Sequence, residues 1–379
     1  MIDPNKGPIG ILGSGQLGQM FTQSAQSMGY QVHVFDKKTH DTPCGNITPF
    51  HTEASFQDEL ALKNFAQQVQ AASYEFENIP FQTAQWIEQH TILRPSSKLL
   101  SIAQDRIQEK KFFSQASFPT TKYKELLRED QLQDIENTFS GKSVIKTSRE
   151  GYDGKGQRVC HSGSEISSAW KELENVPCIV EEWQNFTAEI SVVVARNPQG
   201  QTLCYGPFLN THKNHILYTS QFPCNQPKEI ISQALSISKD LAQNIDLQGV
   251  LCIEFFVCEK QKVLINEIAP RPHNSGHLTI EAFECSQFEQ QVRTLCDLPL
   301  GSNQATVGSA VMINLLGELW EKPNPNFNQV LSIQGTHLHL YGKSEARKGR
   351  KMGHLTICDD SLERVQTKQK HIEDILFQS

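Results

Sequence analysis

Paired cysteines, long apolar runs and an excess of basic residues are all missing from this sequence. Its ten cysteines are scattered, with no C-x-x-C pair and no zinc-like spacing, which indicates reduced thiols. No apolar run approaches the ~20 residues of a membrane-spanning helix, and no charged-then-apolar leader is visible. The net charge of −7 argues against a nucleic-acid or membrane-surface partner. We therefore expect a cytoplasmic protein with no nucleic-acid or membrane partner.

The length and composition indicate a globular protein of several domains. Hydrophobic residues make up 38% of the chain and charged residues 20%, so sizeable cores can be buried. At 379 residues the chain is too long for one ordinary domain, and two or three are expected. Because the net charge is negative, any phosphate-binding basic residues must be local concentrations.

The N-terminal stretch 8–36 has the pattern of a βαβ unit. Its first apolar run leads into the turn Gly13-Ser-Gly-Gln-Leu-Gly18, whose glycines allow a phosphate to approach a helix N-terminus closely. Asp36 lies 18 residues after Gly18, near the position of the ribose-binding acid in dinucleotide-binding folds. An NAD site is one interpretation of this pattern, and simple strand–helix packing is another.

Polar residues end what we interpret as the fourth strand of this first sheet, in Ser73-Tyr-Glu75-Phe-Glu77-Asn78. Ligands in open α/β sheets bind beyond the carboxyl ends of the strands. We therefore expect Glu75 to meet a ligand held by the glycine turn. Asn78 is expected either beside that ligand or as the N-cap of the next helix.

A second glycine-rich stretch follows a strand that ends at Lys146. It reads Gly151-Tyr-Asp-Gly-Lys-Gly-Gln157, and extended structure resumes at Arg158. Three glycines in six residues predict a mobile loop whose amides can cover phosphates, with Lys146 supplying charge. The stretch is not a Walker loop, because the G-K-[ST] ending and the following helix are missing. An ordinary flexible turn is the alternative.

Helical patterns cover residues 99–115, 227–244 and 281–295. In the first of these, the charged residues at 105, 106, 110 and 111 are expected on a solvated face. A later strand passes into Glu181-Glu-Trp-Gln184, which we interpret as a hinge that could give adenine backbone hydrogen bonds and an apolar wall.

Residues 250–277, VLCIEFFVCEKQKVLINEIAPRPHNSGH, have the pattern of an antiparallel hairpin that opens into a polar loop. A symmetric turn in this hairpin places Cys258 opposite Val263 and Glu254 opposite Glu267. Two carboxylates directly opposite each other on one face repel and destabilise the hairpin.

A divalent cation between Glu254 and Glu267 removes this repulsion, because Mg²⁺ favours one or two carboxylates together with substrate phosphates. The sequence therefore predicts a metal–nucleotide site, with Asn266 beside the second carboxylate. A hairpin whose glutamates only face water is the alternative. The loop that follows carries the polar residues Arg271, His273 and Asn274.

The densest basic run lies at 341–354, YGKSEARKGRKMGH. Its embedded glycines predict a folded loop rather than a tail. In an acidic protein such a loop fits anion capture better than nucleic-acid binding. Lys343 and Arg350 are its candidate phosphate ligands.

Taken in order, these motifs resemble those of an ATP-grasp enzyme. Within that superfamily they are most similar to the 5-(carboxyamino)imidazole ribonucleotide synthase family of purine biosynthesis. The resemblance runs from about residue 8 to residue 357, nearly the whole chain. It rests on the stretches 13–20, 75–78, 151–157, 266–277 and 349–354.

The resemblance implies an α/β ATP-grasp fold with a Rossmann-like βαβ pre-domain, a small lid domain and a C-terminal mixed-sheet domain. We place the boundaries at 1–103, 104–183 and 184–379. It also implies a homodimer whose substrates are small molecules.

The activity implied by the resemblance is that of a carbon–nitrogen ligase. ATP would phosphorylate bicarbonate to carboxyphosphate, which carboxylates the exocyclic amine of 5-aminoimidazole ribonucleotide and leaves ADP and phosphate. Phosphoryl transfer needs charge neutralisation and positioning rather than a covalent nucleophile. Because carboxyphosphate is unstable in water, a closing lid is expected.

The same resemblance implies roles for individual residues. ATP would contact Arg106, Lys146, Gly151, Tyr152, Asp153, Gly154, Lys155, Gly156, Gln157, Glu181, Glu182, Trp183, Gln184, Glu189, His212, Asn266 and Glu267. The aminoimidazole and bicarbonate would be surrounded by Tyr152, Asp153, Arg271, His273 and Asn274. The ribonucleotide would bind Gly15, Gln16, Leu17, Glu75, Asn78, Lys343 and Arg350. Glu254 and Glu267 would hold Mg²⁺, with Mn²⁺ as a substitute.

Three other functions compete with this one. A formate-dependent glycinamide ribonucleotide transformylase would share the ATP residues and differ in the acid and the amine. An NAD-dependent oxidoreductase would explain the glycine turn and Asp36 but would leave the Glu254–Glu267 pair unused. A nucleotide sensor without enzymatic activity ranks last, because nothing that the chemistry needs is visibly missing.

Overall fold

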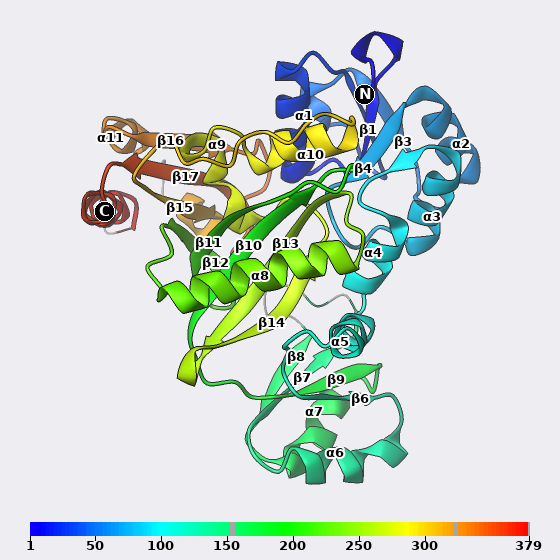
Figure 1. Ribbon diagram of the computed structural model, residues 1–379, viewed down its shortest axis with the longest axis vertical. Helices are drawn as coiled ribbons and strands as arrows, with labels where there is room; N and C mark the ends of the chain where they lie inside the picture. Colours follow the sequence, from blue (N-terminus) through cyan, green and yellow to red (C-terminus); the bar gives the residue numbers. More distant parts are fainter. Residues whose placement is uncertain (150, 152–155, 322–324, 378–379) are drawn as a thin grey trace.

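Three β-sheets organise the chain in a computed structural model that describes residues 1–149, 151, 156–321 and 325–377. The N-terminal sheet lies at one end of the molecule and the smallest sheet at the opposite end. The largest sheet lies between them and extends to the side where the C-terminus lies (Figure 1). The protein is therefore α/β, as the sequence predicts. The predicted domain boundaries stay a prediction.

The N-terminal sheet is parallel and has the strand order β3-β2-β1-β4-β5. Its strands are β1 (Ile9–Leu12), β2 (Val32–Asp36), β3 (Phe50–Glu53), β4 (Ala71–Tyr74) and β5 (Ile92–Leu93). Three helices connect them: α1 (Gln16–Ser27), α2 (Glu59–Gln68) and α3 (Phe81–His90). The alternation of strand and helix produces the parallel order, because a parallel pair needs a crossover.

Both faces of this sheet are buried at its central strand β1, which explains why that strand is apolar throughout. Ile9 and Ile11 point to the face covered by α1 and by α10 (Gln287–Leu295), a helix that comes from the C-terminal half of the chain. Leu12 and Phe35 point to the other face, where α2 and α3 pack. The N-terminal sheet is thus attached to the rest of the molecule through α10.

The smallest sheet is antiparallel, with the order β6-β9-β7-β8. Its strands are β6 (Tyr123–Leu126), β7 (Ser143–Thr147), β8 (Gln157–Cys160) and β9 (Cys178–Glu182). Two short helices, α6 (Leu132–Thr138) and α7 (Ile166–Glu172), bury apolar side chains against the sheet. This unit carries the predicted glycine loop between β7 and β8.

The largest sheet has eight strands in the order β14-β13-β10-β11-β12-β15-β17-β16. Its neighbouring strands pair antiparallel, and a separate parallel bridge joins Thr120 to Ile265. The strands are β10 (Phe186–Arg196), β11 (Thr202–Lys213), β12 (Ile216–Phe222), β13 (Gly249–Cys258), β14 (Lys262–Ala269), β15 (Ser309–Leu316), β16 (Thr336–Leu340) and β17 (Lys351–Asp359).

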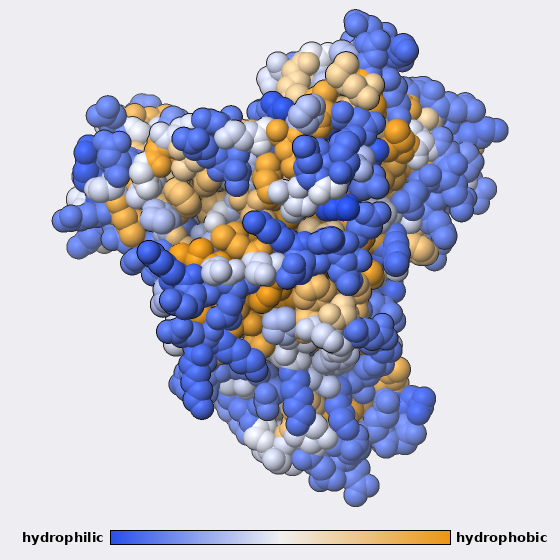
Figure 2. Space-filling model, viewed as in Figure 1, coloured by the Kyte–Doolittle hydropathy of each residue, from blue (hydrophilic) through white to orange (hydrophobic). Residues whose placement is uncertain are grey.

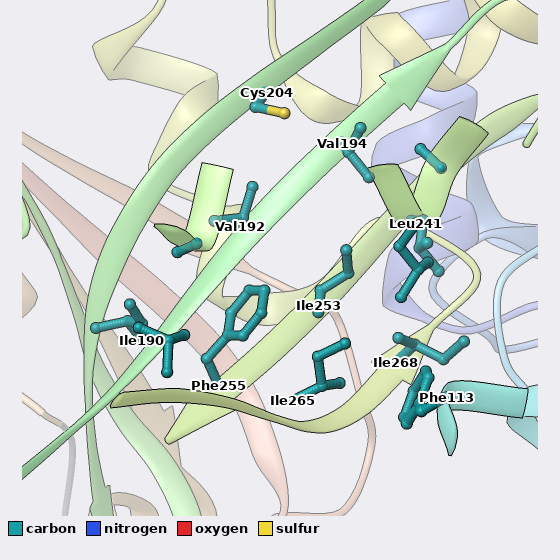
Figure 3. Close-up of a cluster of buried hydrophobic side chains, with 14 of the residues drawn as sticks. Phe113, Ile190, Val192, Val194, Cys204, Leu241, Ile253, Phe255, Ile265 and Ile268 are labelled. Atoms are coloured by element: carbon teal, nitrogen blue, oxygen red, sulfur yellow. The ribbon is translucent and has the colours of Figure 1, made fainter. Parts of the chain in front are cut away.

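The main core lies between this sheet and α8 (Lys228–Asn244), a helix that the sequence predicts almost to the residue. Figure 3 shows Leu241 of α8 in one buried cluster with Val194 and Ile253 of the sheet, and Phe113 adds a side chain from another helix. The C-terminal helices α11 (Phe327–Leu331) and α12 (Leu362–Phe377) flank the far strands. Figure 2 shows a mostly hydrophilic face, with hydrophobic residues gathered along its middle, near α8.

Two helices predicted as continuous are broken, so these predictions were wrong in detail. The stretch 99–115 forms α4 (Ser97–Ala103) and α5 (Arg106–Gln115), because Asp105 caps α5 by accepting bonds from two of its first amides. The stretch 281–295 contains the end of α9 (Thr279–Ala282) and all of α10, which begins after the N-cap Ser286.

The hairpin register was predicted correctly where it bears on the site and wrongly at the turn. Glu254 pairs with Glu267, but Cys258 pairs with Lys262 rather than with Val263. A bulge at Asn266 shifts the register by one residue, which compensates for a three-residue connection in place of the symmetric turn. Within the described part of the chain, no helix is long and apolar enough to cross a membrane.

Candidate active site

The glycine turn at the start of α1 binds an acid of the protein itself. The Gly15 and Gly18 amides donate to the Glu75 carboxylate, with 2.7 Å between Gly18 N and Glu75 Oε2. The Ser14 amide and hydroxyl donate to Asp36 at 2.9 and 2.8 Å. Glu75 therefore occupies the Gly15 and Gly18 amides, and the contact of this turn with a ligand phosphate stays a prediction.

Gln16 and Leu17 lie at the exposed edge of the same turn, half-buried at the start of α1. Burial raises the pKa of Glu75, although the Gly18 and Gly15 amides oppose this shift. Asn78 is exposed and is not a helix cap, because α3 begins after Pro80.

The basic loop from the far end of the chain reaches this turn. Lys343 lies close enough to Glu75 for the carboxylate to raise its pKa, but burial and the cations Arg350 and Lys351 lower that pKa to about 8 overall. Lys343 Nζ donates to the Lys351 carbonyl at 2.7 Å, and Arg350 Nη1 donates to the Glu345 carbonyl at 2.8 Å. The structure thus brings together the two regions predicted to bind the ribonucleotide.

Arg271 joins the same region from the loop that follows β14. Its Nη2 forms an ion pair with Glu77, and Glu75 also lies near enough to favour its charged form. Its Nε is buried without a hydrogen-bond partner in the described structure. A buried, unpaired donor on a guanidinium is costly, which favours a ligand oxygen at this point.

The predicted metal pair lies at one edge of the large sheet, with Glu267 on the edge strand β14 and Glu254 on its neighbour β13. Burial acts to raise the pKa of Glu254, but His273 and then His212 lower it to about 2. Although the Glu267 side chain reaches solvent, the surrounding protein and the charge of Glu254 raise its pKa. Opposed carboxylates of this kind fit Mg²⁺. No cluster of three or more His, Cys, Asp or Glu suited to a metal occurs among the described residues.

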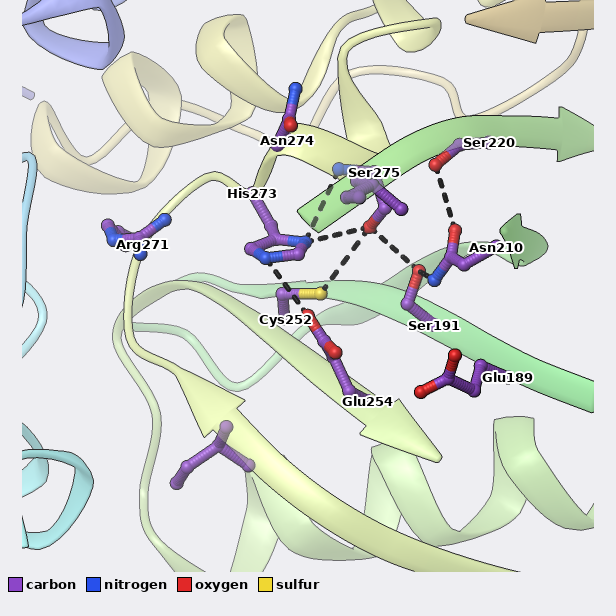
Figure 4. A network of polar contacts seen from close by, with 12 residues as sticks. Glu189, Ser191, Asn210, Ser220, Cys252, Glu254, Arg271, His273, Asn274 and Ser275 are labelled. Carbon is purple, nitrogen blue, oxygen red and sulfur yellow. Dashed lines mark hydrogen bonds and ion pairs between the residues drawn. The ribbon is translucent and has the colours of Figure 1, made fainter. Parts of the chain in front are cut away.

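His273 is oriented by a hydrogen-bond network that crosses four strands (Figure 4). Its Nε2 lies 3.0 Å from Glu254 Oε1 and its Nδ1 lies 2.9 Å from Ser275 Oγ. The network continues through Ser191 to Asn210 at 2.7 and 2.9 Å, and ends at Ser220 on β12. Burial acts to lower the pKa of His273, but Cys252 and Glu254 raise it to about 10.

Asn274 points away from His273 in Figure 4 and is buried. It exchanges amide hydrogen bonds with Asn314 on β15, at 3.0 and 2.6 Å. This pairing fixes the loop backbone beside His273. The catalytic role predicted for Asn274 stays a prediction.

The residues predicted to hold the ATP phosphates meet at the junction of the lid and the large sheet. Lys146 on β7 forms an ion pair with Glu181 on β9, with 2.6 Å between Nζ and Oε2. Arg106 at the start of α5 donates to the Thr147 carbonyl at 3.0 Å and to the Gly151 carbonyl at 2.5 Å. Burial acts to raise the pKa of Glu181, but Lys110 and Lys146 lower it to about 2.

The predicted hinge, residues 181–184, covers the end of β9 and the start of its connection to β10. Gln184 donates to the Glu182 side chain at 3.2 Å, and Lys142 lies 3.4 Å from the centre of the Trp183 ring. Farther along, Glu189 on β10 and His212 on β11 face each other, with 2.7 Å between His212 Nδ1 and Glu189 Oε2. The His212 side chain is half-buried.

Family models match three successive parts of the chain. They describe a ribonucleotide synthetase preATP-grasp domain at residues 7–104, an ATP-grasp domain at 111–288 and a phosphoribosylaminoimidazole carboxylase C-terminal domain at 310–368. The N5-carboxyaminoimidazole ribonucleotide synthase of Bacillus subtilis is 38% identical over 366 residues, which are 95% of this chain and 94% of the relative. The chain belongs to the N5-carboxyaminoimidazole ribonucleotide synthase family.

Solved structures of this family agree with the assignment. An N5-carboxyaminoimidazole ribonucleotide synthetase in complex with ADP is 39% identical, with a TM-score of 0.92 over 99% of each chain. The Aspergillus clavatus enzyme, solved with ADP and 5-aminoimidazole ribonucleotide, is 25% identical, with a TM-score of 0.90 over 100% of each chain. The synthase described here is therefore an ATP-dependent ligase of purine biosynthesis. The NAD-dependent oxidoreductase interpretation is wrong, and the Asp36 carboxylate that suggested it binds Ser14 instead.

Part of the predicted site lies outside the described residues of the synthase, namely Tyr152, Asp153, Gly154 and Lys155. Gly156 and Gln157 are described. Gln157 pairs with Lys146 across the β7–β8 ladder, and Gly156 has a φ of +69° that favours glycine.

Sequence reasoning missed Lys110, which it placed on a solvated face, and Glu109, which it did not single out. Both are buried, with exposures of 1% and 2%. A signal was present, because Lys110 lies three residues from both Ile107 and Phe113 and therefore shares the buried face of α5.

Proposed function

We propose that the synthase uses bicarbonate as its carbon source, through carboxyphosphate. A bicarbonate oxygen attacks the γ-phosphorus of ATP and ADP leaves. The exocyclic amine of 5-aminoimidazole ribonucleotide then receives the carboxyl carbon, and phosphate is released as the C–O bond breaks. Water must be kept from the intermediate while this happens.

One observation carries the proposal: Arg271 and His273 lie two residues apart on one short loop. One of them contacts an acid that follows a strand of the N-terminal sheet, and the other contacts an acid on the large sheet. Arg271 pairs with Glu77 beside the glycine turn, and His273 pairs with Glu254 on the hairpin. A ribonucleotide near Arg271 and a phosphoryl group near Glu254 would therefore be neighbours. Short transfer distances of this kind favour a reactive intermediate that does not leave the site.

The ribonucleotide phosphate is assigned to Lys343 and Arg350, together with the amides at the start of α1. Because Glu75 holds the Gly15 and Gly18 amides, the phosphate is assigned to the amides of Gln16 and Leu17. Arginine suits bidentate contact with a phosphate, and lysine adds a point charge.

The ATP phosphates are assigned to Arg106, Lys146 and the glycine loop 151–157, and the adenosine to the hinge 181–184 with Glu189 and His212. Glu254 and Glu267 would hold Mg²⁺, or Mn²⁺ in its place, since both metals accept carboxylate oxygens. A bound divalent cation neutralises charge on the transferring phosphoryl group. The buried Glu181 holds the Lys146 side chain through an ion pair.

The proposal extends to a cytoplasmic homodimer. All ten cysteines are free and nine are buried, which suits a reducing compartment. The homodimer rests on the family resemblance and is checked by sedimentation equilibrium.

Glu267→Gln tests the metal assignment. We expect it to abolish ATP turnover, because the site loses a carboxylate ligand of Mg²⁺. The fold should stay intact, because one of two repelling carboxylates becomes a neutral amide of the same shape. Turnover is measured as phosphate release with ATP, Mg²⁺, bicarbonate and the ribonucleotide, omitting one component at a time and replacing bicarbonate by formate. Full activity of a folded Glu267→Gln protein would overturn the assignment.

A further inference from the structure

Lys110 is a buried cation at the junction of α5, the lid and the metal hairpin. Its side chain is 1% exposed. Its Nζ donates three hydrogen bonds, to Thr120 Oγ1 at 2.8 Å, Asn266 O at 2.9 Å and Ile265 O at 3.4 Å. These use the three donors of the ammonium, and the charge of Lys110 also pairs with Glu181, with 3.3 Å between Nζ and Oε1. None of the roles assigned above uses this residue.

Two of the acceptors belong to the bulge of the metal hairpin. At a bulge the strand ladder is interrupted, and its backbone groups need other partners. Lys110 binds the carbonyls of Ile265 and Asn266 on one side of Glu267, while the preceding residue Glu109 accepts from the Ile268 amide at 2.7 Å on the other side. Consecutive residues of α5 therefore hold the backbone on both sides of Glu267.

The ion pair with Glu181 connects Lys110 to Lys146, the lysine assigned to the ATP phosphates. Lys110 lies on one oxygen of the Glu181 carboxylate and Lys146 lies on the other. Glu181 is nearly inaccessible to solvent, so its position depends on these two cations rather than on water. A displacement of Lys110 would move both the bulge and the Glu181–Lys146 pair.

We propose that Lys110 is a positioning residue that fixes the Asn266–Glu267 bulge relative to the Glu181–Lys146 pair. It sets the distance between the carboxylate that holds the metal and the lysine that holds the ATP phosphates, and it touches neither ligand. The inference rests on the proposed function, which places magnesium and ATP at these residues.

Lys110→Met tests it, because methionine keeps an unbranched side chain without the charge. The matched control is Lys111→Met: Lys111 is the next residue of α5, 38% exposed, and pairs with Glu125 at 2.9 Å. Initial rates are measured against Mg²⁺, ATP and ribonucleotide concentration, and the binding of Mg²⁺–ADP is measured without turnover by isothermal titration calorimetry. For Lys110→Met we expect the half-saturating Mg²⁺ concentration and the KM for ATP to rise about tenfold. The KM for the ribonucleotide should stay within about twofold, and Lys111→Met should match the wild type.

A purely structural role would raise all three constants together, and that outcome would overturn the proposal. Wild-type Mg²⁺ and ATP dependence in a folded Lys110→Met protein would overturn it too. If Lys110→Met does not fold, Thr120→Val removes one acceptor of Lys110 and leaves the ion pairs intact. That variant is expected to raise the half-saturating Mg²⁺ concentration about threefold, and an unchanged value would contradict the inference.

Glu267→Gln, assayed in parallel, distinguishes a failure of the metal assignment from a failure of the positioning role of Lys110. An active Glu267→Gln protein refutes the metal assignment on which the inference rests. An inactive Glu267→Gln protein beside an unaffected Lys110→Met protein refutes only the positioning role of Lys110.

Discussion

At the scale of single residues, Lys343 links the charge of the proposed ribonucleotide site to pH. Its pKa is lowered to about 8 by burial and by Arg350 and Lys351, so the free enzyme loses this cation just above neutral pH. A phosphate monoester is a dianion there, with a second pKa of about 6, and it favours the protonated lysine. We predict that the KM for the ribonucleotide rises as the pH increases through about 8, toward tenfold per pH unit.

Lys343→Arg is the control, because arginine stays charged at every pH of the assay. Its KM for the ribonucleotide should change little between pH 7 and pH 9, with rates of product formation as the measurement. Arg350→Ala, in contrast, should raise this KM at all pH values and leave the KM for ATP nearly unchanged. A KM for the wild type that is flat through pH 8 would count against phosphate binding by Lys343.

Individual site residues differed in how far the sequence could predict them. The Glu254–Glu267 pairing follows from the alternation of strand residues. The predicted pairing is correct although the predicted turn is wrong, because the Asn266 bulge restores the register. Glu75 was placed correctly at the end of β4, but its bond to the Gly15 and Gly18 amides depends on how two strands meet. That geometry is not encoded in any local pattern.

At the scale of elements, the β7–β8 hairpin depends on one glycine. Gly156 has a φ of +69°, and a Cβ there would lie 2.6 Å from Thr147 Oγ1. The left-handed conformation alone costs a non-glycine residue about 1–2 kcal/mol. We predict that Gly156→Ala raises the KM for ATP several-fold, because Arg106 and Lys146 contact the neighbouring backbone and side chains.

Gly141→Ala is the matched control in the same small sheet unit, since a Cβ at Gly141 meets no atom within 4 Å. Steady-state rates at varied ATP and thermal unfolding are measured for both variants. A Gly156→Ala enzyme with the KM and Tm of Gly141→Ala would show that the hairpin tolerates a side chain at this position.

The broken helices show what a periodic apolar pattern hides. The pattern runs through Asp105 and through the segment before Ser286, so each pair of helices was predicted as one. Yet Asp105 caps α5, and Ser286 accepts from the Glu289 amide in a Ser-x-x-Glu arrangement that marks a helix start. Capping residues therefore carried information that the periodicity did not.

At the scale of the whole molecule, motif order predicted the α/β fold and the family, whereas the contacts between the sheets were not predictable. Arg94, for example, forms an ion pair with Asp297 at 2.8 Å, about half the chain away. The loop that carries Arg271 and His273 likewise contacts Glu77 beside the N-terminal sheet and Glu254 on the large sheet. Contacts of this kind follow from the packing of complete domains rather than from local sequence.

The transfer of ¹⁸O from labelled bicarbonate to inorganic phosphate tests the central claim most directly. If bicarbonate attacks ATP and the carboxyphosphate C–O bond then breaks, the released phosphate keeps one bicarbonate oxygen. We predict one labelled oxygen in each phosphate, formed only when ATP and 5-aminoimidazole ribonucleotide are both present, as measured by mass spectrometry. Unlabelled phosphate accompanying carboxylated product would contradict the account.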